Sequence, residues 1–414
     1  MSARALDPLL DDGLVDAPHE AFARLREHDP VHRVEGTDVF AVCRLDLIHE
    51  VVADPATYSS RTDEFLHVLP DGTAELRSAS GSTPDADSTI AILAIADPPD
   101  HGRQRKVLNP VLSNQAVAQR ESGLRTLVDR TLAPHLRAGE IDWMASVAEP
   151  LPMIMLARLL GAADEDAGFL QRFGYAAVEL TNGLTSDERI EEIHGTLFDL
   201  GPIGDLYNEA RAGSGPDATT IIGACAAAVG TGEMDDIEAL GIIMMMGAAG
   251  GESTASLLGS GARILAQDLA LQQQLRNDPA LIPAFVEEVC RLEPPFRGHY
   301  RRVMRDAVLG GVDVPAGSRL LLLWPAANRD RALGDNADEV DVTRPAPRQH
   351  VGFGWGIHLC VGAPLARLEA KVAFEQLLAS TTRFELAEPD ALQHHRSLMV
   401  RRLVTLPLAL HPAR

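Results

Sequence analysis

Positive charge is scarce in this sequence: 37 Lys and Arg stand against 59 Asp and Glu, which leaves a formal net charge of −22. Because a polyphosphate partner needs a basic face, this balance excludes a protein that binds nucleic acid unaided. Lys106 and Lys371 are the only lysines, so nearly all positive charge is carried by arginine. Apolar residues still reach 46%, which is enough to build a large folded core.

Long apolar runs are also missing. The longest apolar stretches, residues 221–230 and 241–251, fall short of the roughly 18 residues that a membrane span requires. The first twelve residues carry Asp7, Asp11 and Asp12 and contain no apolar segment of signal-peptide length. We therefore expect a cytoplasmic protein without a membrane partner.

Cysteines are few and widely separated. Cys43, Cys225, Cys290 and Cys360 match no zinc-ribbon spacing, and nothing in the sequence marks the chain for export. The pattern argues against a disulfide framework.

Helical periodicity, in contrast, is abundant. It predicts helices at residues 19–28, 45–53, 103–112, 115–138, 145–160, 166–180, 188–211, 236–267, 268–276, 280–292 and 363–381. Short strands are expected at 31–34, 39–42, 307–309, 319–324 and 384–386. The loop-like stretches 79–88 and 212–219 are too short to separate independent domains. The sequence thus predicts a mainly α protein with small β-sheets.

The most informative segment surrounds Cys360. Gly354 and Gly356 precede this cysteine and allow tight backbone turns, while Pro364 suits the first turn of a following helix. Backbone N–H groups and a helix N-terminus would stabilise a thiolate here. Three interpretations remain open from these residues: a buried structural cysteine, a hydrolytic nucleophile with His358 as its base, and a metal ligand.

The same segment resembles the haem-binding signature of the cytochrome P450 family. Residues 353–362 match Phe-Gly-x-Gly-x-His-x-Cys-x-Gly, and residues 365–369 match Leu-Ala-Arg-x-Glu. The likeness to soluble bacterial members runs from about residue 17 to residue 410. It implies the cytochrome P450 fold, a triangular helical domain with a long central helix over haem. On this basis residues 1–414 form a single domain, with residues 1–16 as a flexible N-terminal segment.

The resemblance also assigns a cofactor, heme b (iron protoporphyrin IX), and its ligands. Cys360 would be the axial thiolate that binds the iron, with Phe353 beside it and Gly362 closing the motif. The haem propionates would be held by four basic residues, namely His101, Arg105, Arg301 and His358.

Another family pattern is the Glu-x-x-Arg pair, which here is Glu288 and Arg291. The two lie three residues apart on an expected helix and so share one face. In the family this pair binds a downstream arginine, for which Arg344 is our candidate. These three residues would be structural.

An acid and two hydroxyl groups, Glu252, Ser253 and Thr254, interrupt the apolar helix expected at 236–267. One interpretation is that Glu252 caps a local kink at Gly250 and Gly251. The other, which we favour, follows from the resemblance, because the family delivers protons from an Ala-Gly-x-Asp/Glu-Thr site; it makes Glu252, Ser253 and Thr254 the catalytic residues. Ser253 departs from the usual threonine: it keeps the hydroxyl group but lacks the methyl group that fixes its rotamer.

Substrate-pocket candidates come partly from helical spacing and partly from the resemblance. Met245 and Ala248 lie one to two turns before Ser253, although a methionine stripe is more often core filling. The full set of candidates comprises Met245, Ala248, Ala249, Phe296, His299, Leu398 and Met399.

The resemblance implies a haem-thiolate monooxygenase that activates O2 with two external electrons and hydroxylates or epoxidises a largely apolar small molecule. A ferredoxin and an NAD(P)H-dependent ferredoxin reductase would supply the electrons, and the protein would be a monomer. We expect the ferredoxin to dock near Arg103, Lys106, Arg367 and Lys371. The alternatives are a peroxide-using haem-thiolate enzyme and a non-catalytic haem- or substrate-binding member of the family.

Overall fold

The computed structural model describes residues 7–62, 64–79, 91–197, 199–389 and 392–413, and these are mainly helical. The helices are α1 (His19–His28), α2 (Leu45–Ala53), α3 (Asp100–Leu112), α4 (Asn114–Ala118), α5 (Glu121–Ala138), α6 (Pro150–Leu160), α7 (Ala167–Glu179), α8 (Asp187–Leu197), α9 (Gly201–Arg211), α10 (Ile221–Gly230), α11 (Asp236–Gly250), α12 (Glu252–Gln267), α13 (Leu269–Asn277), α14 (Ile282–Leu292), α15 (Trp324–Ala327) and α16 (Ala363–Ser380).

The strands form small sheets. The largest has the order β1 (Val31–Arg33), β2 (Val39–Val42), β10 (Arg319–Leu323), β7 (Gly298–Val303) and β3 (Tyr58–Ser59). Its β2–β10 pair is parallel, and the other pairs are antiparallel. A second sheet joins β11 (Thr381–Leu386), β12 (Pro407–Pro412) and β6 (Glu140–Asp142). The remaining strands form two hairpins, β4 (Glu64–Val68) with β5 (Ala74–Ser78) and β8 (Ala307–Leu309) with β9 (Val312–Val314).

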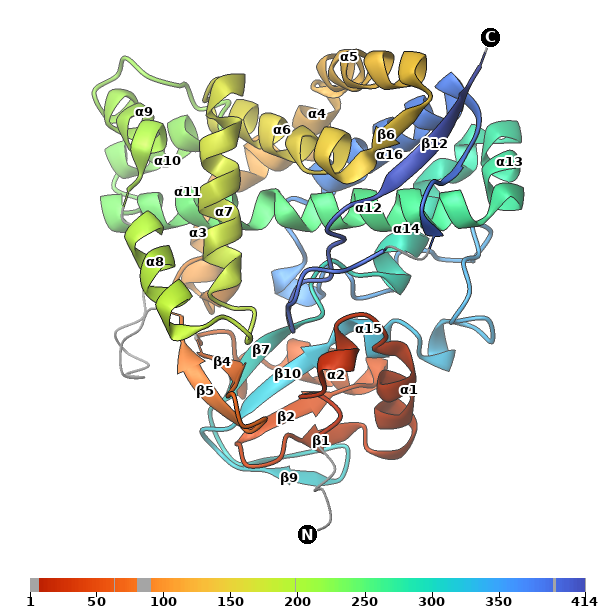
Figure 1. The fold of residues 1–414 in the computed structure, drawn as a ribbon. Helices are drawn as coiled ribbons and strands as arrows, with labels where there is room; N and C mark the ends of the chain where they lie inside the picture. The colour runs from red at the N-terminus through yellow and green to blue at the C-terminus, as the bar shows by residue number, and fades with distance from the viewer. Residues whose placement is uncertain (1–6, 63, 80–90, 198, 390–391, 414) are drawn as a thin grey trace.

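These helices and strands are divided between two regions of the molecule (Figure 1). The largest sheet lies with α1 and α2 on one side of the molecule, and most of the other helices fill the opposite side. Helices α11 and α12 follow one another in a line across the helical region. A site built where α11 meets α12 therefore lies in the interior of the helical region.

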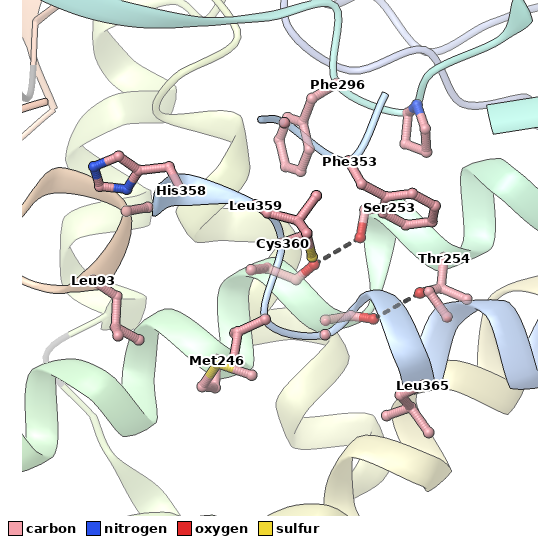
Figure 2. A pocket seen from close by; sticks show the side chains of 18 of the residues that line it. Leu93, Met246, Ser253, Thr254, Phe296, Phe353, His358, Leu359, Cys360 and Leu365 are labelled. Carbon is pink, nitrogen blue, oxygen red and sulfur yellow. Dashed lines mark hydrogen bonds between the residues drawn. The ribbon is translucent and has the colours of Figure 1, made fainter. Parts of the chain in front are cut away.

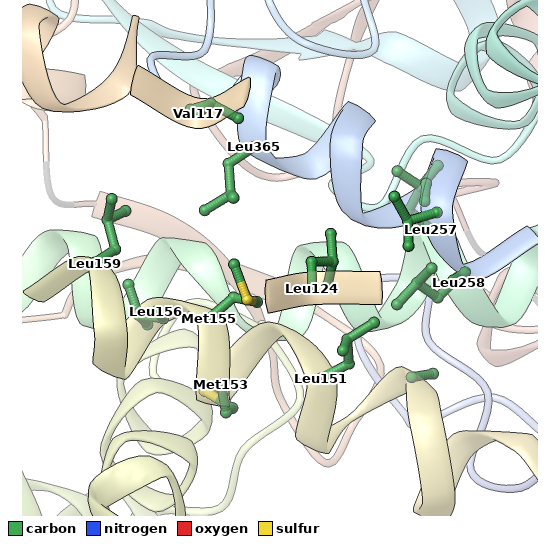
Figure 3. Close-up of a cluster of buried hydrophobic side chains, with 14 of the residues drawn as sticks. Val117, Leu124, Leu151, Met153, Met155, Leu156, Leu159, Leu257, Leu258 and Leu365 are labelled. Atoms are coloured by element: carbon green, nitrogen blue, oxygen red, sulfur yellow. The ribbon is translucent and has the colours of Figure 1, made fainter. Parts of the chain in front are cut away.

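The main core surrounds α12. Leu257 and Leu258 of this helix meet Leu151 and Leu156 of α6 and Leu365 of α16 in one buried cluster (Figure 3). Each fully buried side chain of this size stabilises the fold by roughly 1.5–3 kcal/mol. The core thereby fixes α6, α12 and α16 relative to one another, which holds the walls of the site described below.

The sequence predictions of the fold class and of most elements are confirmed. Helices α1 and α2 have the predicted bounds, whereas the long segments 115–138, 188–211 and 236–267 are each divided into two helices. Helix α10 was not predicted, because seven of its ten residues are buried and a helix that is apolar nearly all round shows no amphipathic period. Several short strands, among them β6, β7 and β12, were also missed.

The N-terminal segment differs from our expectation of flexibility. Residues 1–6 lie outside the described residues, but Leu9, Leu10 and Leu14 are buried in the core cluster that includes α1. Arg297 donates hydrogen bonds to the carbonyl oxygens of Leu14 and Val15, at 2.7 and 2.6 Å. Apolar burial and these two bonds hold residues 9–15 in place.

Helices α7 and α11 approach each other closely at Gly174, and this contact yields a stability prediction. A Cβ atom on Gly174 would lie 2.6 Å from the carbonyl oxygen of Gly247. Gly174→Ala should therefore lower the free energy of unfolding by about 1–3 kcal/mol, measured by urea titration. Gly195→Ala is the control, because an added Cβ there meets no atom within 4 Å and should be neutral or slightly stabilising. Equal stability of the Gly174 variant and the parent would contradict this description of the packing.

Candidate functional site

An internal cavity lies between α3, α6, the α11–α12 junction and the loop before α16 (Figure 2). The structure brings most of the predicted site residues to this one space. Those that line it are His101, Arg105, Met245, Ala249, Ser253, Thr254, Phe296, His299, Arg301, Phe353, His358, Cys360 and Gly362.

Cys360 stands at the end of a tight loop whose shape follows from its glycines. Gly354 and Gly356 have φ values of 74° and 66°, in the left-handed region that favours glycine. The backbone N–H of Cys360 donates to the carbonyl oxygen of Phe353 at 2.8 Å. Arg105 of α3 reaches across and donates to the carbonyl oxygen of Leu359 at 2.6 Å. The loop therefore presents the Cys360 side chain to the cavity in a fixed position.

The surroundings of Cys360 shift the pKa of its thiol in opposite directions. Burial raises the pKa of its thiol, and the opposing contributions of the Gly362 and Ala363 backbone N–H groups and of Arg105 do not reverse that shift. The glycine-rich loop alone thus leaves a thiol. A metal cation at the sulfur would supply the missing positive charge, since coordination deprotonates a thiol.

One end of the cavity is basic. The His101 and His358 rings lie with centroids 4.2 Å apart, and the Ser60 hydroxyl group is 2.9 Å from His358 Nε2. Burial, followed by the charges of Arg301 and His101, lowers the pKa of His358 to about 3. Burial also lowers the pKa of Arg301 to about 10. Repulsion among these groups indicates that an anion belongs between them.

Arg105 and Arg301 lie at this basic end of the cavity, and some of their N–H donors are available to a ligand. Arg301 donates to the carbonyl oxygen of Tyr300 at 2.8 Å, and Arg105 donates to main-chain carbonyls only. Within the described ranges, neither Arg105 nor Arg301 forms an ion pair with a carboxylate. The set of donors therefore suits a ligand that brings its own carboxylate groups.

At the α11–α12 junction, the hydroxyl groups of Ser253 and Thr254 and the carboxylate of Glu252 bind different partners. Ser253 donates to the carbonyl oxygen of Ala249 at 2.7 Å, and Thr254 donates to that of Gly250 at 3.3 Å. Such bonds to the carbonyl four residues back bend helices, which accounts for the break at Gly251. Ser253 and Thr254 both line the cavity, and Glu252 does not.

Glu252 instead forms a buried ion pair. Arg402 donates to its carboxylate at 3.0 Å and also bonds to Glu149, while the Arg402 guanidinium lies 4.6 Å from the centre of the Tyr175 ring. Burial raises the pKa of Glu252, against the lowering influence of Arg402. Glu252 is therefore turned toward α6 and the segment before β12.

Three predicted pocket residues lie outside the cavity lining. Ala248 is one residue before Ala249, and its Cα atom would lie 3.5 Å from a Cβ atom on Gly174 of α7. The backbone N–H of Leu398 donates to the carbonyl oxygen of Asn182, and Met399 is 5% exposed in the core cluster of the largest sheet. These long-range contacts could not be read from helical spacing.

The comparisons with known proteins agree with this geometry. The family model for Cytochrome P450 matches residues 231–407. Cytochrome P450 144 of Mycobacterium tuberculosis (strain ATCC 25618 / H37Rv) is 37% identical over 398 residues, which cover 95% of this chain and 89% of the relative. This chain belongs to the cytochrome P450 family. Vitamin D(3) 25-hydroxylase of Pseudonocardia autotrophica is 30% identical over 95% of this chain and 94% of its own. The crystal structure of CalO2 superposes with a TM-score of 0.84 at 26% identity, over 99% of this chain and 100% of that one.

Cytochrome P450 enzymes are monooxygenases that contain haem iron, and the residues present here fit that group. The cavity offers a thiol that lacks a cation at one position and a cluster of basic side chains that lacks an anion at another. An iron porphyrin with two carboxylate groups carries both missing charges. No helix among the described residues is long and apolar enough to cross a membrane.

Behind the Cys360 loop of this cytochrome P450, the predicted triad is assembled. Glu288 accepts two hydrogen bonds from Arg291, at 2.7 and 2.8 Å, and two from Arg344, at 2.9 and 3.3 Å. The backbone N–H of Asp341 also donates to Glu288 at 2.9 Å. Glu287, the neighbouring acid, binds Arg367 instead, at 2.7 and 3.0 Å. The two adjacent glutamates thus join α14 to different segments.

The cations expected to dock a ferredoxin are mostly matched by acids. Arg103 donates to Glu238, Arg367 donates to Glu287, and Lys371 lies 3.4 Å from Glu121. Lys106 is exposed and forms no ion pair within the described part of the chain. The surface around Arg103, Lys106, Arg367 and Lys371 therefore has less unbalanced positive charge than the sequence suggests.

The cavity lining also contains residues that were not predicted as site residues from the sequence, among them Trp324 and Glu369, which carry polar groups. Trp324 donates its indole N–H to Nδ1 of His299 at 2.9 Å, so the proton of the neutral imidazole is on Nε2. Burial lowers the pKa of His299 to about 4, which keeps it neutral. Glu369 is the final residue of the haem-binding signature, which was the available signal for it.

Removal of the Glu288 carboxylate, which binds both Arg291 and Arg344, should strongly destabilise the protein. Glu288→Ala leaves two arginines buried without their partner, so we expect the free energy of unfolding to fall by about 3–5 kcal/mol in urea titrations followed by circular dichroism. Glu20→Ala, which removes the exposed i,i+4 pair with Arg24, should change it by less than about 0.5 kcal/mol. A Glu288 variant as stable as the Glu20 variant would refute a structural role for the triad.

Proposed function

We propose that this enzyme uses O2 and two externally supplied electrons to hydroxylate or epoxidise a largely apolar small molecule. The observation that carries the proposal is the arrangement of one cavity: Cys360 and the hydroxyl groups of Ser253 and Thr254 line it together with apolar side chains such as Met245 and Phe296. A thiolate ligand, a source of protons and an apolar binding space are the three elements that this reaction needs.

The haem proposed for this cavity is heme b. When bound, it supplies oxygen activation, which a cysteine thiolate ligand favours by donating electron density. Cys360 would ligate the iron, and His101, Arg105, Arg301 and His358 would hold the propionate groups. His299 faces the same cavity with its Nε2–H as a donor, and Phe353 would shield the sulfur from water.

The protein side chains would control water and protons around the substrate. Leu93, Leu156 and Met245 line the cavity and exclude water from it, which limits the loss of reducing equivalents as peroxide. The Ser253 hydroxyl group can donate a hydrogen bond into the cavity or return it to the carbonyl oxygen of Ala249. A hydroxyl group relays a proton when its oxygen accepts one from a donor such as water while its own proton passes to an acceptor in the cavity.

We also propose that a ferredoxin and an NAD(P)H-dependent ferredoxin reductase supply the electrons, and that the enzyme is a cytoplasmic monomer. Lys106 on α3 lies one residue from Arg105, which contacts the Cys360 loop. An exposed lysine at this place would favour an acidic carrier close to the haem. Relatives named vitamin D(3) 25-hydroxylase and linalool 8-monooxygenase support oxygen insertion as the reaction class.

Loss of the thiolate tests the core of this proposal. Cys360→Ser should abolish the red-shifted Soret band of the reduced carbon-monoxide complex, because that shift requires a thiolate ligand to the iron. Cys225→Ala, in buried α10 outside the cavity, is the matched control and should keep the band. A band that survives in the Cys360 variant would overturn the assignment.

Turnover assays of the parent enzyme distinguish the monooxygenase from the two alternative functions. Product formed with NADH, the ferredoxin and the reductase supports the monooxygenase. Product formed only with hydrogen peroxide would point to the peroxide-using class, and substrate binding without any turnover would point to a non-catalytic member.

Ser253 should control how tightly oxygen consumption is coupled to product. Loss of one hydrogen bond worth about 1 kcal/mol changes a kinetic partition about fivefold, so Ser253→Ala should raise peroxide per NADH by about that factor. Ser253→Thr should lower it, because the added methyl group restricts the rotamer. NADH, O2, peroxide and product are measured together. If product per NADH is the same in the alanine variant and the parent, the hydroxyl group does not take part.

A further inference from the structure

Phe296 lines the cavity from a short paired segment, the Phe296 wall, in which residues 295–297 lie beside residues 399–401 (Figure 2). Phe296 forms an antiparallel bridge with Val400 in the middle of this wall. Two backbone hydrogen bonds, at 2.7 and 2.9 Å, flank the bridge, from Arg297 to Met399 and from Arg401 to Pro295. The position of the Phe296 ring therefore depends on the position of the whole wall.

Two arginine side chains of the wall point away from the cavity. Arg297 and Arg401 are 3% and 8% exposed, and neither lines the cavity. Arg297 donates to the carbonyl oxygens of Leu14 and Val15, at 2.7 and 2.6 Å. Arg401 donates to those of Val15 and Asp16, at 2.7 and 3.2 Å. The N-terminal segment, residues 7–16, thus lies directly behind the wall and is bound to it by four charge-assisted hydrogen bonds.

The N-terminal segment is itself held in place by contacts of its own. Its three leucines belong to the buried cluster that includes Val400 and packs against Phe296. At the start of the segment, the Asp7 carboxylate lies 3.0 Å from Nε2 of His32 and accepts two backbone hydrogen bonds at 2.9 Å. Because the segment is fixed at its start and along its length, it can support the wall behind which it lies.

The carbonyl oxygens of Leu14 and Val15 compensate a buried positive charge. In the ranges that the structure describes, Arg297 forms no ion pair with a carboxylate, whereas Arg401 donates to Glu293 at 2.8 Å. Burial lowers the pKa of Arg297 to about 9. A buried guanidinium without acceptors is costly, so Arg297 keeps the wall in contact with the N-terminal segment.

We infer that Arg297 and Arg401 are positioning residues, which hold the Phe296 wall against the N-terminal segment and thereby determine how tightly the cavity packs around a ligand that reaches Phe296. The inference rests on the proposed function, in which this cavity holds haem and a largely apolar substrate. When the arginines lose the carbonyl oxygens, the backbone pairing of the wall remains but its support does not, and the Phe296 ring no longer has a single position. Ligands too small to touch Phe296 are unaffected.

Two nitrogen ligands of haem iron measure this support in the haem-loaded protein. Imidazole binds the iron alone, whereas 4-phenylimidazole adds an aromatic ring that must pack against the apolar lining, which includes Phe296. Arg297→Met keeps a long apolar side chain and removes both bonds to the N-terminal segment. Since one aromatic contact changes affinity about fivefold, the variant should bind 4-phenylimidazole about fivefold more weakly relative to imidazole, as measured from the shift of the Soret band.

Three further variants separate positioning from a general structural effect. Arg297→Lys keeps a cation that can donate to the same carbonyl oxygens, so it should restore part of the affinity. Phe296→Ala should lose as much affinity as Arg297→Met, and the two changes combined should lose no more than Phe296→Ala alone. Arg276→Met removes a half-buried guanidinium of α13 that donates to Thr381 outside the cavity lining, and it should bind both ligands as the parent does. Losses that add in the combined variant overturn the inference.

Hydrogen exchange of the wall provides an independent measurement that needs no ligand. Arg297→Met removes the donor side of the contact, and Leu14→Ala loosens the acceptor side by opening a gap in the core cluster. In both variants, amides of residues 295–301 and 399–402 should exchange about tenfold faster, while those of α16 keep the rates of the parent. Leu269→Ala, at an exposed position of α13, should leave all these rates unchanged. If Leu14→Ala does not speed exchange in the wall, the N-terminal segment is not its support and the inference is overturned.

Failure of the proposed function would look different from failure of this inference. If neither imidazole nor 4-phenylimidazole shifts the Soret band of the parent, the cavity does not hold an accessible haem iron, and the proposed function fails together with the role given to the wall. If both ligands shift the band and their relative affinity is the same in the parent and in Arg297→Met, only the role of Arg297 and the N-terminal segment is refuted.

Discussion

The site depends on the placement of one sulfur atom at the start of α16. The Cys360 backbone bonds to Phe353, the left-handed glycines turn the loop, and Arg105 holds it from α3. Because α16 is packed against the core around α12, the loop that precedes it has a fixed relation to the α11–α12 junction. The distance between the thiol and the hydroxyl groups of Ser253 and Thr254 is thereby determined by the packing of the core.

The balance of charge in the cavity differs from that of the protein as a whole. The chain has a net charge of −22, yet its interior contains arginines bound to buried glutamates, as in the Glu288–Arg291–Arg344 triad. Inside the cavity the balance is reversed, because Arg105 and Arg301 line it and, in the part of the chain that the structure describes, form no ion pair with a carboxylate. A thiol that needs a cation and a basic cluster that needs an anion lie in one space, and this combination selects a metal complex with acidic side groups.

The sequence was sufficient for features encoded by local pattern. Helices α1 and α2 have strong amphipathic periods and were predicted with their observed bounds, and the Cys360 loop was found from its motif. Features set by distant partners were not predictable. Glu252 turns toward Arg402, which is 150 residues away, and Leu398 bonds to Asn182 across the fold. Trp324 joins the cavity because α15 packs against it, which no local pattern expresses.

The central claim is that Cys360 binds the iron of a haem in this cavity, and X-ray absorption at the iron edge of the resting holoprotein tests it most directly. The account predicts one sulfur atom in the first coordination shell of the iron, replaced by a light atom in Cys360→Ser. Cys43, Cys225 and Cys290 remain in that variant as free cysteines. A shell of nitrogen and oxygen alone in the parent, or a sulfur atom that persists in the variant, would contradict the account.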